Sequence, residues 1–133
     1  MENLKKISSK EFKKLNDGFH FVKGFHVIIS CQYIQTWEQL SEALGNAFQF
    51  PMRNEEMDAT WDWLTDLSWL GNQEEINIYF DHEKEFLKTD LPLKERVFDF
   101  FNKLILFWKE DVKTAFIAGE IGRPKQFNVY LID

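Results

Sequence analysis

Cysteine is nearly absent from this chain: Cys31 is the only one in 133 residues. A single thiol cannot close an internal disulfide bond or form a cysteine metal cluster. Chains without disulfide bonds are typical of reducing compartments. We therefore expect a cytoplasmic protein in which Cys31, at the end of an apolar segment, is a small core residue.

Long apolar runs are also missing. Residues 1–14 are rich in lysine but hold no apolar stretch resembling the core of a signal peptide, and residues 98–108, the most apolar later run, include Asp99 and Lys103. We expect a protein that is neither exported nor embedded in a membrane. At 44% hydrophobic residues and without an internal repeat, the chain is predicted to form one domain with a sizeable core.

The third absence concerns positive charge, because no Lys or Arg occurs between Arg53 and Lys84. The same stretch contains nine acids: Glu55, Glu56, Asp58, Asp62, Asp66, Glu74, Glu75, Asp81 and Glu83. The net charge of the chain is −6, and residues 1–24 hold six lysines against three acids, so their +3 leaves −9 for the remainder. Such a body repels nucleic acid and anionic membranes, and it favours a basic protein as partner.

Three apolar segments predict strands, at residues 25–31, 76–80 and 127–132. The first is nearly continuous in apolar and β-branched residues, which predicts a central strand buried on both faces of a parallel sheet. Helical periodicity predicts three helices, over residues 36–49, 54–69 and 92–108. Their expected N-caps are Thr36, Asn54 and Asp90.

This order of elements predicts an α/β fold with three layers, in which helices pack on a small, mostly parallel, three-stranded sheet. The domain is expected to span residues 25–133. Residues 1–24 are expected to form an N-terminal extension with a short helix near residues 9–15 and a marginal strand at residues 19–22.

The helix expected at residues 54–69 is two-sided. At about 100° per residue, Glu55, Asp58, Asp62 and Asp66 fall within roughly 80° of arc, opposite the apolar residues Met57, Trp61 and Leu64. Like charges four residues apart cost a helix about 0.2–0.5 kcal/mol per pair. The acidic stripe therefore does not help the helix to fold, which leaves two interpretations: a solvated face or a binding surface.

An enzyme would use Asp58 and Asp62 as a paired acid and base, and a metal protein would use them to bind Mg²⁺ or Ca²⁺. Two carboxylates four residues apart are common on helices, and a catalytic pair also needs a cleft that shifts its pKa. The chain has no EF-hand loop, and its three histidines are scattered. We therefore expect no enzymatic activity, no cofactor and no metal site.

The region around this helix resembles the barstar family of small intracellular ribonuclease inhibitors. The matching residues are Phe50-Pro51, a short loop, and then Met57-Asp58-Ala59-Thr60-Trp61-Asp62-Trp63-Leu64-Thr65. They follow the family pattern of Pro, loop and apolar-Asp-Ala-x-Trp-Asp-x-Leu-Thr. The resemblance is specific over residues 28–67 and general in element order beyond them, and it covers neither residues 1–24 nor the insertion at residues 111–126.

The resemblance implies a stoichiometric inhibitor or immunity protein, monomeric when free, that inserts this helix and the preceding loop into the active site of a basic ribonuclease or related toxin. Asp58 and Asp62 match the two helix aspartates of the family, and Asp62 is expected at the energetic centre. The full set of expected partner-binding residues is Arg53, Asn54, Glu55, Asp58, Trp61, Asp62 and Asp66.

The loop departs from the family. It is one residue shorter, lacks the family's tyrosines and glycine, and carries Glu56 where an asparagine is common. Arg53 adds a positive charge beside a surface meant for a basic partner. An acidic protein-interaction module of the same fold, without a nuclease target, is therefore the alternative function.

Overall fold

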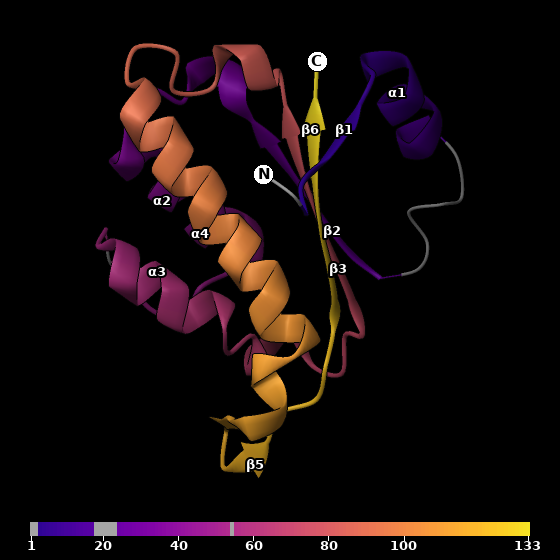
Figure 1. Cartoon of the computed structure of the whole chain (residues 1–133), viewed down its shortest axis with the longest axis vertical. Helices are drawn as coiled ribbons and strands as arrows, with labels where there is room; N and C mark the ends of the chain where they lie inside the picture. Colours follow the sequence, from indigo (N-terminus) through magenta and orange to yellow (C-terminus); the bar gives the residue numbers. More distant parts are fainter. Residues whose placement is uncertain (1–2, 18–23, 54) are drawn as a thin grey trace.

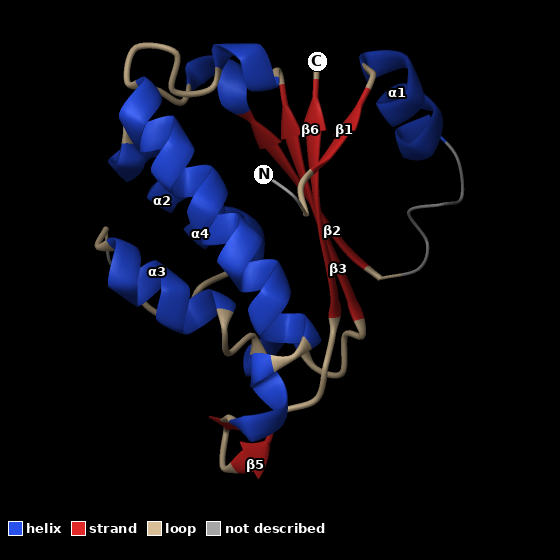
Figure 2. Ribbon diagram, viewed as in Figure 1, coloured by secondary structure: helices blue, strands red, loops and turns tan. Residues whose placement is uncertain are grey.

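A parallel sheet between two layers of helices forms the centre of the computed structural model, which describes residues 3–17, 24–53 and 55–133 (Figure 1). The strands lie in the order β1 (Lys5–Ile7), β6 (Gln126–Ile132), β3 (Glu75–Asp81) and β2 (Phe25–Ser30), each parallel to its neighbour. Helix α1 (Ser9–Asp17) lies on one side of the sheet, and α2 (Trp37–Phe48), α3 (Met57–Leu64) and α4 (Leu91–Lys109) lie on the other (Figure 2). The predicted three-layer α/β fold is confirmed.

The prediction that the first apolar segment is the central strand is wrong. Strand β2 lies at one edge of the sheet, and β3 and β6 occupy the middle. Helices cover only one face of β2: Val27 and Ile29 are buried against α2, whereas Ile28, which points the other way, is 45% exposed. Continuous apolar character indicated a strand, but it did not distinguish an edge from the centre.

The sheet has four strands rather than the expected three, because β1 pairs with β6 in parallel. Strand β1 comes from the segment predicted to be an extension. Its three residues are too few to show a hydrophobic period, and Lys5 and Lys6 conceal it further. The expected strand at residues 19–22 lies outside the described residues. The boundary between extension and domain at residue 25 stays a prediction.

Helix α1 covers part of the second face of the sheet through one buried aromatic residue. Phe12 packs on Tyr79 with ring centroids 5.3 Å apart, and both belong to a small cluster with Ile132. Tyr79 stacks in turn on Tyr130 at 5.0 Å and 9°. Residues 3–17 therefore contribute their own contacts to the core.

The main core lies on the opposite face, between the sheet and helices α2 and α4. Helix α2 begins at the expected capping box, in which the Thr36 side chain accepts from the Gln39 backbone and the Gln39 side chain accepts from the Thr36 backbone. Asp90 caps α4 by accepting from the Leu93 amide, as expected. Cys31 is fully buried, as predicted, and burial raises the pKa of its thiol.

After α4 a short 3₁₀ turn, Asp111–Thr114, leads into a small antiparallel hairpin of β4 (Phe116–Ile117) and β5 (Glu120–Ile121). The hairpin folds back tightly enough that a Cβ at Gly122 would lie 2.4 Å from a methyl carbon of Val112, so no larger residue fits there. None of the helices in the described part of the chain combines the length and apolarity that crossing a membrane requires.

Replacing Phe12 by alanine tests whether α1 stabilises the domain. The change removes a buried ring from the cluster around Tyr79, so we expect the free energy of unfolding to fall by about 3 kcal/mol. Exposed Lys10 on the same helix is the matched control, and Lys10→Ala should change it by less than about 0.5 kcal/mol. Urea denaturation measures both. Equal, small effects would show that α1 is a dispensable part of an extension.

Alkaline pH should destabilise the protein through the stacked tyrosines. Burial and the neighbouring Tyr130 and Glu75 raise the pKa of Tyr79 to about 12, whereas an unfolded tyrosine titrates near about 10. The contribution of Tyr79 to stability is therefore fully present below about pH 10. It falls as the pH rises toward about 12, because the unfolded state loses the Tyr79 hydroxyl proton more readily than the folded state does. Urea midpoints at about pH 8 and about pH 11 should differ less in Tyr79→Phe than in the native protein. An identical difference in both proteins would contradict the assignment.

Candidate functional site

Helix α3, which carries the acidic residues, is held by contacts along one side. Leu64 is fully buried, and half-buried Trp61 meets Phe100 of α4 edge-on, with ring centroids 5.4 Å apart. The indole N–H of Trp108, also on α4, donates to the Leu64 carbonyl at 2.9 Å. These contacts orient the helix, so its opposite side faces solvent.

Asp58 and Asp62 occupy that outer side, one turn apart, and both are exposed, as predicted. Neither forms an ion pair with any Lys or Arg in the described ranges; the ion pairs found there involve Asp81, Glu83, Glu85, Asp99 and Glu110. The lack of cations between Arg53 and Lys84 accounts for this, since no neighbour along the chain can neutralise the carboxylates.

The acidic helix is shorter than predicted, and residues 54–69 do not form one helix. Its N-cap is Glu56, which has an extended backbone and makes no side-chain capping bond. Asn54, the expected N-cap and an expected contact residue, lies outside the described residues. Glu55 therefore precedes the helix and Asp66 follows it, so the stripe of four carboxylates on one helix face is wrong at both ends.

The helix stops early because Leu67 must reach the core. Leu67 is 1% exposed and adopts a left-handed backbone with φ of 57°, which turns its side chain inward. Half-buried Asp66 lies in this turn, where its Oδ1 accepts from the Ser68 amide at 2.9 Å. Asp66 thus has a structural bond that its position in the sequence did not reveal.

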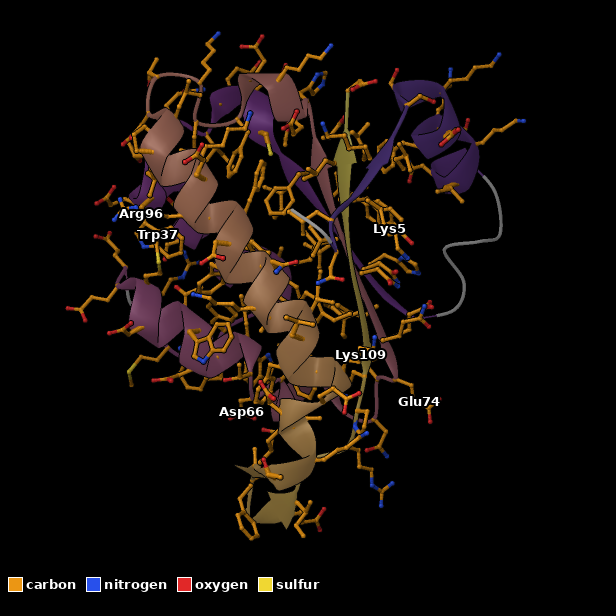
Figure 3. All side chains as sticks on the ribbon, viewed as in Figure 1. Lys5, Trp37, Asp66, Glu74, Arg96 and Lys109 are labelled. Carbon is orange, nitrogen blue, oxygen red and sulfur yellow. The ribbon has the colours of Figure 1, made fainter. Side chains whose placement is uncertain are left out.

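The loop before α3 is held by side chains from two helices. Trp37 at the start of α2 donates its indole N–H to the Glu55 carbonyl, and Trp63 of α3 donates to the Met52 carbonyl at 3.1 Å. The Arg53 guanidinium donates to the side-chain carbonyl of Asn46 on α2. Figure 3 places Trp37 on the side of the molecule where α3 begins. The loop is therefore fixed to the helices on both sides.

A cleft of about 680 Å³ separates this loop from α2. Four acids, one cation and three uncharged residues line it: Glu38, Glu42, Glu55, Glu56, Arg53, Ser41, Gly45 and Phe50. Arg53 and Glu55, both predicted contact residues, are exposed at this cleft, next to α3. The single positive charge on the acidic surface is therefore located at the loop and not on the helix.

A smaller hollow of about 280 Å³ brings Asp62 and Asp66 together with Met52 and Trp63. The predicted set of contact residues omitted the last two. Met52 is 69% exposed at this hollow, beside the two aspartates. The sequence did not show this exposure, because a methionine in a loop is equally compatible with the core.

The geometry supports binding of cations on a protein partner. Ionised carboxylates only accept hydrogen bonds, and bonds from guanidinium or ammonium groups to them are among the strongest in proteins. Within the described residues, no group of three or more His, Cys, Asp or Glu side chains is placed to hold a metal ion. The two exposed aspartates, one turn apart on an anchored helix, offer such carboxylate acceptors side by side at the candidate site.

Comparison with protein families matches residues 25–119 to the model of Barstar (barnase inhibitor). The match includes α2, the loop and α3, and it ends before β6. Searches of curated proteins and of solved structures found no match. Because the family model spans more than half of the chain and the sheet and helices fit an α/β fold of this kind, the chain belongs to the barstar family.

Proposed function

We propose that the protein is a stoichiometric inhibitor that blocks the active site of a basic ribonuclease or related toxin, acting as an immunity protein in the cytoplasm of a bacterium. The observation that supports this most directly is the pair Asp58 and Asp62, exposed and without an ion pair to any described Lys or Arg. The family adds support, since its model is described as that of a barnase inhibitor.

The mechanism follows from the chemistry of RNA cleavage sites. A ribonuclease binds phosphate with Arg, Lys and His side chains, and a carboxylate offers these groups the same acceptor oxygens that a phosphate does. Asp62 occupies the centre of the inhibitory surface, and Asp58 binds a second cation one turn away. Trp61 borders the helix face and contacts the rim of the enzyme. The complex needs no cofactor or metal ion.

The residues beside α3 extend this surface in two directions. Arg53, Asn54 and Glu55 meet the partner through the loop, and Asp66 meets it beyond the end of the helix. Because Asp66 already accepts a bond from Ser68, it contributes less than Asp62. The free protein is a monomer, and its acidic body excludes nucleic acid as a partner.

The alternative is an acidic protein-interaction module of the same fold without a nuclease target. Arg53 favours it, because an exposed guanidinium beside α3 repels part of a uniformly basic active site. A partner with one acidic group opposite Arg53 and basic groups opposite the aspartates would satisfy this surface equally well.

Capture of the partner followed by an inhibition assay tests the two functions. Immobilised protein is exposed to lysate and culture medium of the source cell, and retained ribonuclease activity is titrated with free protein. An inhibitor should abolish the activity at a one-to-one end point. Retention of a partner without ribonuclease activity, through a surface that Asp62→Ala disrupts, would favour the interaction module and contradict inhibition.

Asp62→Ala should weaken binding to the captured ribonuclease by more than about 2 kcal/mol, mainly through faster dissociation, because a desolvated cation on the enzyme loses its partner. Thermal unfolding should hardly change, since exposed Asp62 forms no ion pair in the described structure. Stopped-flow kinetics at two salt concentrations measures the binding effect.

Glu74→Ala is the matched control for charge alone. Glu74 is exposed and lies well away from α3 (Figure 3), so its loss should only lower the association rate slightly, and less at high salt. Equal, small effects of the two variants would show that α3 holds no energetic centre.

A further inference from the structure

Four of the five tryptophans use their indole N–H in the same way, around the proposed inhibitory surface. Each donates to a backbone carbonyl at the end of a helix or in the loop before α3: Trp37 to Glu55, Trp63 to Met52, Trp69 to Phe48 and Trp108 to Leu64. The carbonyls that accept from Trp69 and Trp108 terminate α2 and α3. The other two acceptors belong to the loop itself, three residues apart, and bracket Arg53.

Apart from these two bonds, the side chains of the loop make one described bond to a helix, from the Arg53 guanidinium to Asn46 on α2. Met52, Arg53 and Glu55 are exposed, so no burial of their side chains holds the backbone. Among the backbone hydrogen bonds of the described turns and loops, none involves Met52 or Arg53. Fixing a residue in one backbone conformation costs conformational entropy, and bonds from outside the loop offset this cost.

The two donors are themselves anchored in aromatic clusters. Trp37 meets Phe100 of α4 edge-on at 6.1 Å, and Trp63 meets Trp69 edge-on at 5.4 Å and Phe50 at 6.4 Å. Rings packed in this way have little rotamer freedom, so each indole N–H points in a fixed direction. Trp63 also occupies a variable position of the family pattern, between Trp61-Asp62 and Leu64-Thr65.

We propose that Trp37 and Trp63 are positioning residues for the inhibitory surface: their indole N–H groups hold the backbone at Met52 and Glu55, on either side of Arg53, in the conformation that binds the partner. The proposal rests on the proposed function for what the loop binds. Preorganisation of this kind lowers the ordering cost of association. It also provides a way of fixing a loop that is shorter than usual in the family and lacks the usual tyrosines and glycine.

Trypsin gives a readout of loop order that needs no partner. Arg53 lies between the two accepted carbonyls, and trypsin cleaves after it only when the loop opens. Arg96, within α4, is cleaved only when the domain unfolds and serves as the internal control. Cleavage follows the open population when opening is fast. The variants are Trp37→Phe and Trp63→Phe, which keep an aromatic ring but remove the N–H group.

Loss of one such hydrogen bond, about 1 kcal/mol, should speed cleavage after Arg53 about fivefold in either variant, with cleavage after Arg96 unchanged. The matched control replaces Trp69 by benzothienylalanine, which removes the same kind of bond from the end of α2 but keeps the ring that packs on Trp63. It should change cleavage after Arg53 less than about twofold. The proposal is overturned if cleavage after Arg53 and after Arg96 rises equally, if neither loop variant speeds cleavage, or if the change at Trp69 acts as strongly.

A change in ring size could lower the global stability and obscure the result. If thermal unfolding shifts by more than about 5 °C, benzothienylalanine, which has tryptophan's shape but no N–H, replaces the phenylalanine at each position. The expected ratios of cleavage after Arg53 to cleavage after Arg96 stay the same for these variants, and so do the results that would overturn the proposal.

Binding kinetics test whether the hydrogen bonds from Trp37 and Trp63 matter for binding of the partner. Each loop variant should weaken binding to the captured ribonuclease about fivefold. The effect should be the same at low and high salt, because the lost hydrogen bond is to a neutral carbonyl. The effect of Glu74→Ala on the association rate should instead diminish at high salt. Faster cleavage after Arg53 with unchanged binding would overturn the positioning role. If no ribonuclease is captured, the proposed function fails, while the trypsin ratios still decide whether the indoles order the loop.

Discussion

Helix α3 cannot be stable by itself, and this constraint organises the rest of the site. It has eight residues, fewer than the about 12–15 that an isolated helix needs in water, and its aspartates one turn apart repel each other. Its conformation must therefore come from packing on α4 through Trp61 and Leu64. The same packing determines which side faces solvent, so the contacts that stabilise the helix also present Asp58 and Asp62.

Charge is distributed so that these carboxylates remain available. The described lysines of the first seventeen residues lie in α1, on the opposite side of the sheet from α3, and in β1, at one edge of the sheet (Figure 1). None of them forms an ion pair within the described structure. The electrostatic cost of keeping acids unpaired is small in water, but it becomes useful when a cationic partner removes the solvent around them.

Aromatic residues supply many of the packing contacts and hydrogen bonds near this surface. In the loop before α3, the carbonyls of Met52 and Glu55 accept hydrogen bonds from Trp63 and Trp37. Tryptophan suits this task because one side chain provides both a large packing surface and a directed donor. For the proposed binding through fixed carboxylates, bonds that hold Met52 and Glu55 in place beforehand lower the ordering cost of association.

Local information in the sequence was sufficient for much of the fold and for the exposure of Asp58 and Asp62. Alternation, helical period and capping residues such as Thr36 and Asp90 are encoded by neighbours in the chain, so α2, α4 and the three long strands could be predicted. The aspartate pair followed from the same period and from the absence of nearby cations. The family pattern then indicated what such a pair is for.

Tertiary structure decided the features that depend on distant segments. The edge position of β2, the pairing of β1 with β6 and the early end of α3 at Leu67 each result from contacts across the fold. The bonds from Trp37 and Trp63 likewise join parts of the chain whose spacing in sequence shows no regular pattern. Periodicity reports only which side of an element is apolar, and what that side meets is determined when the whole chain packs.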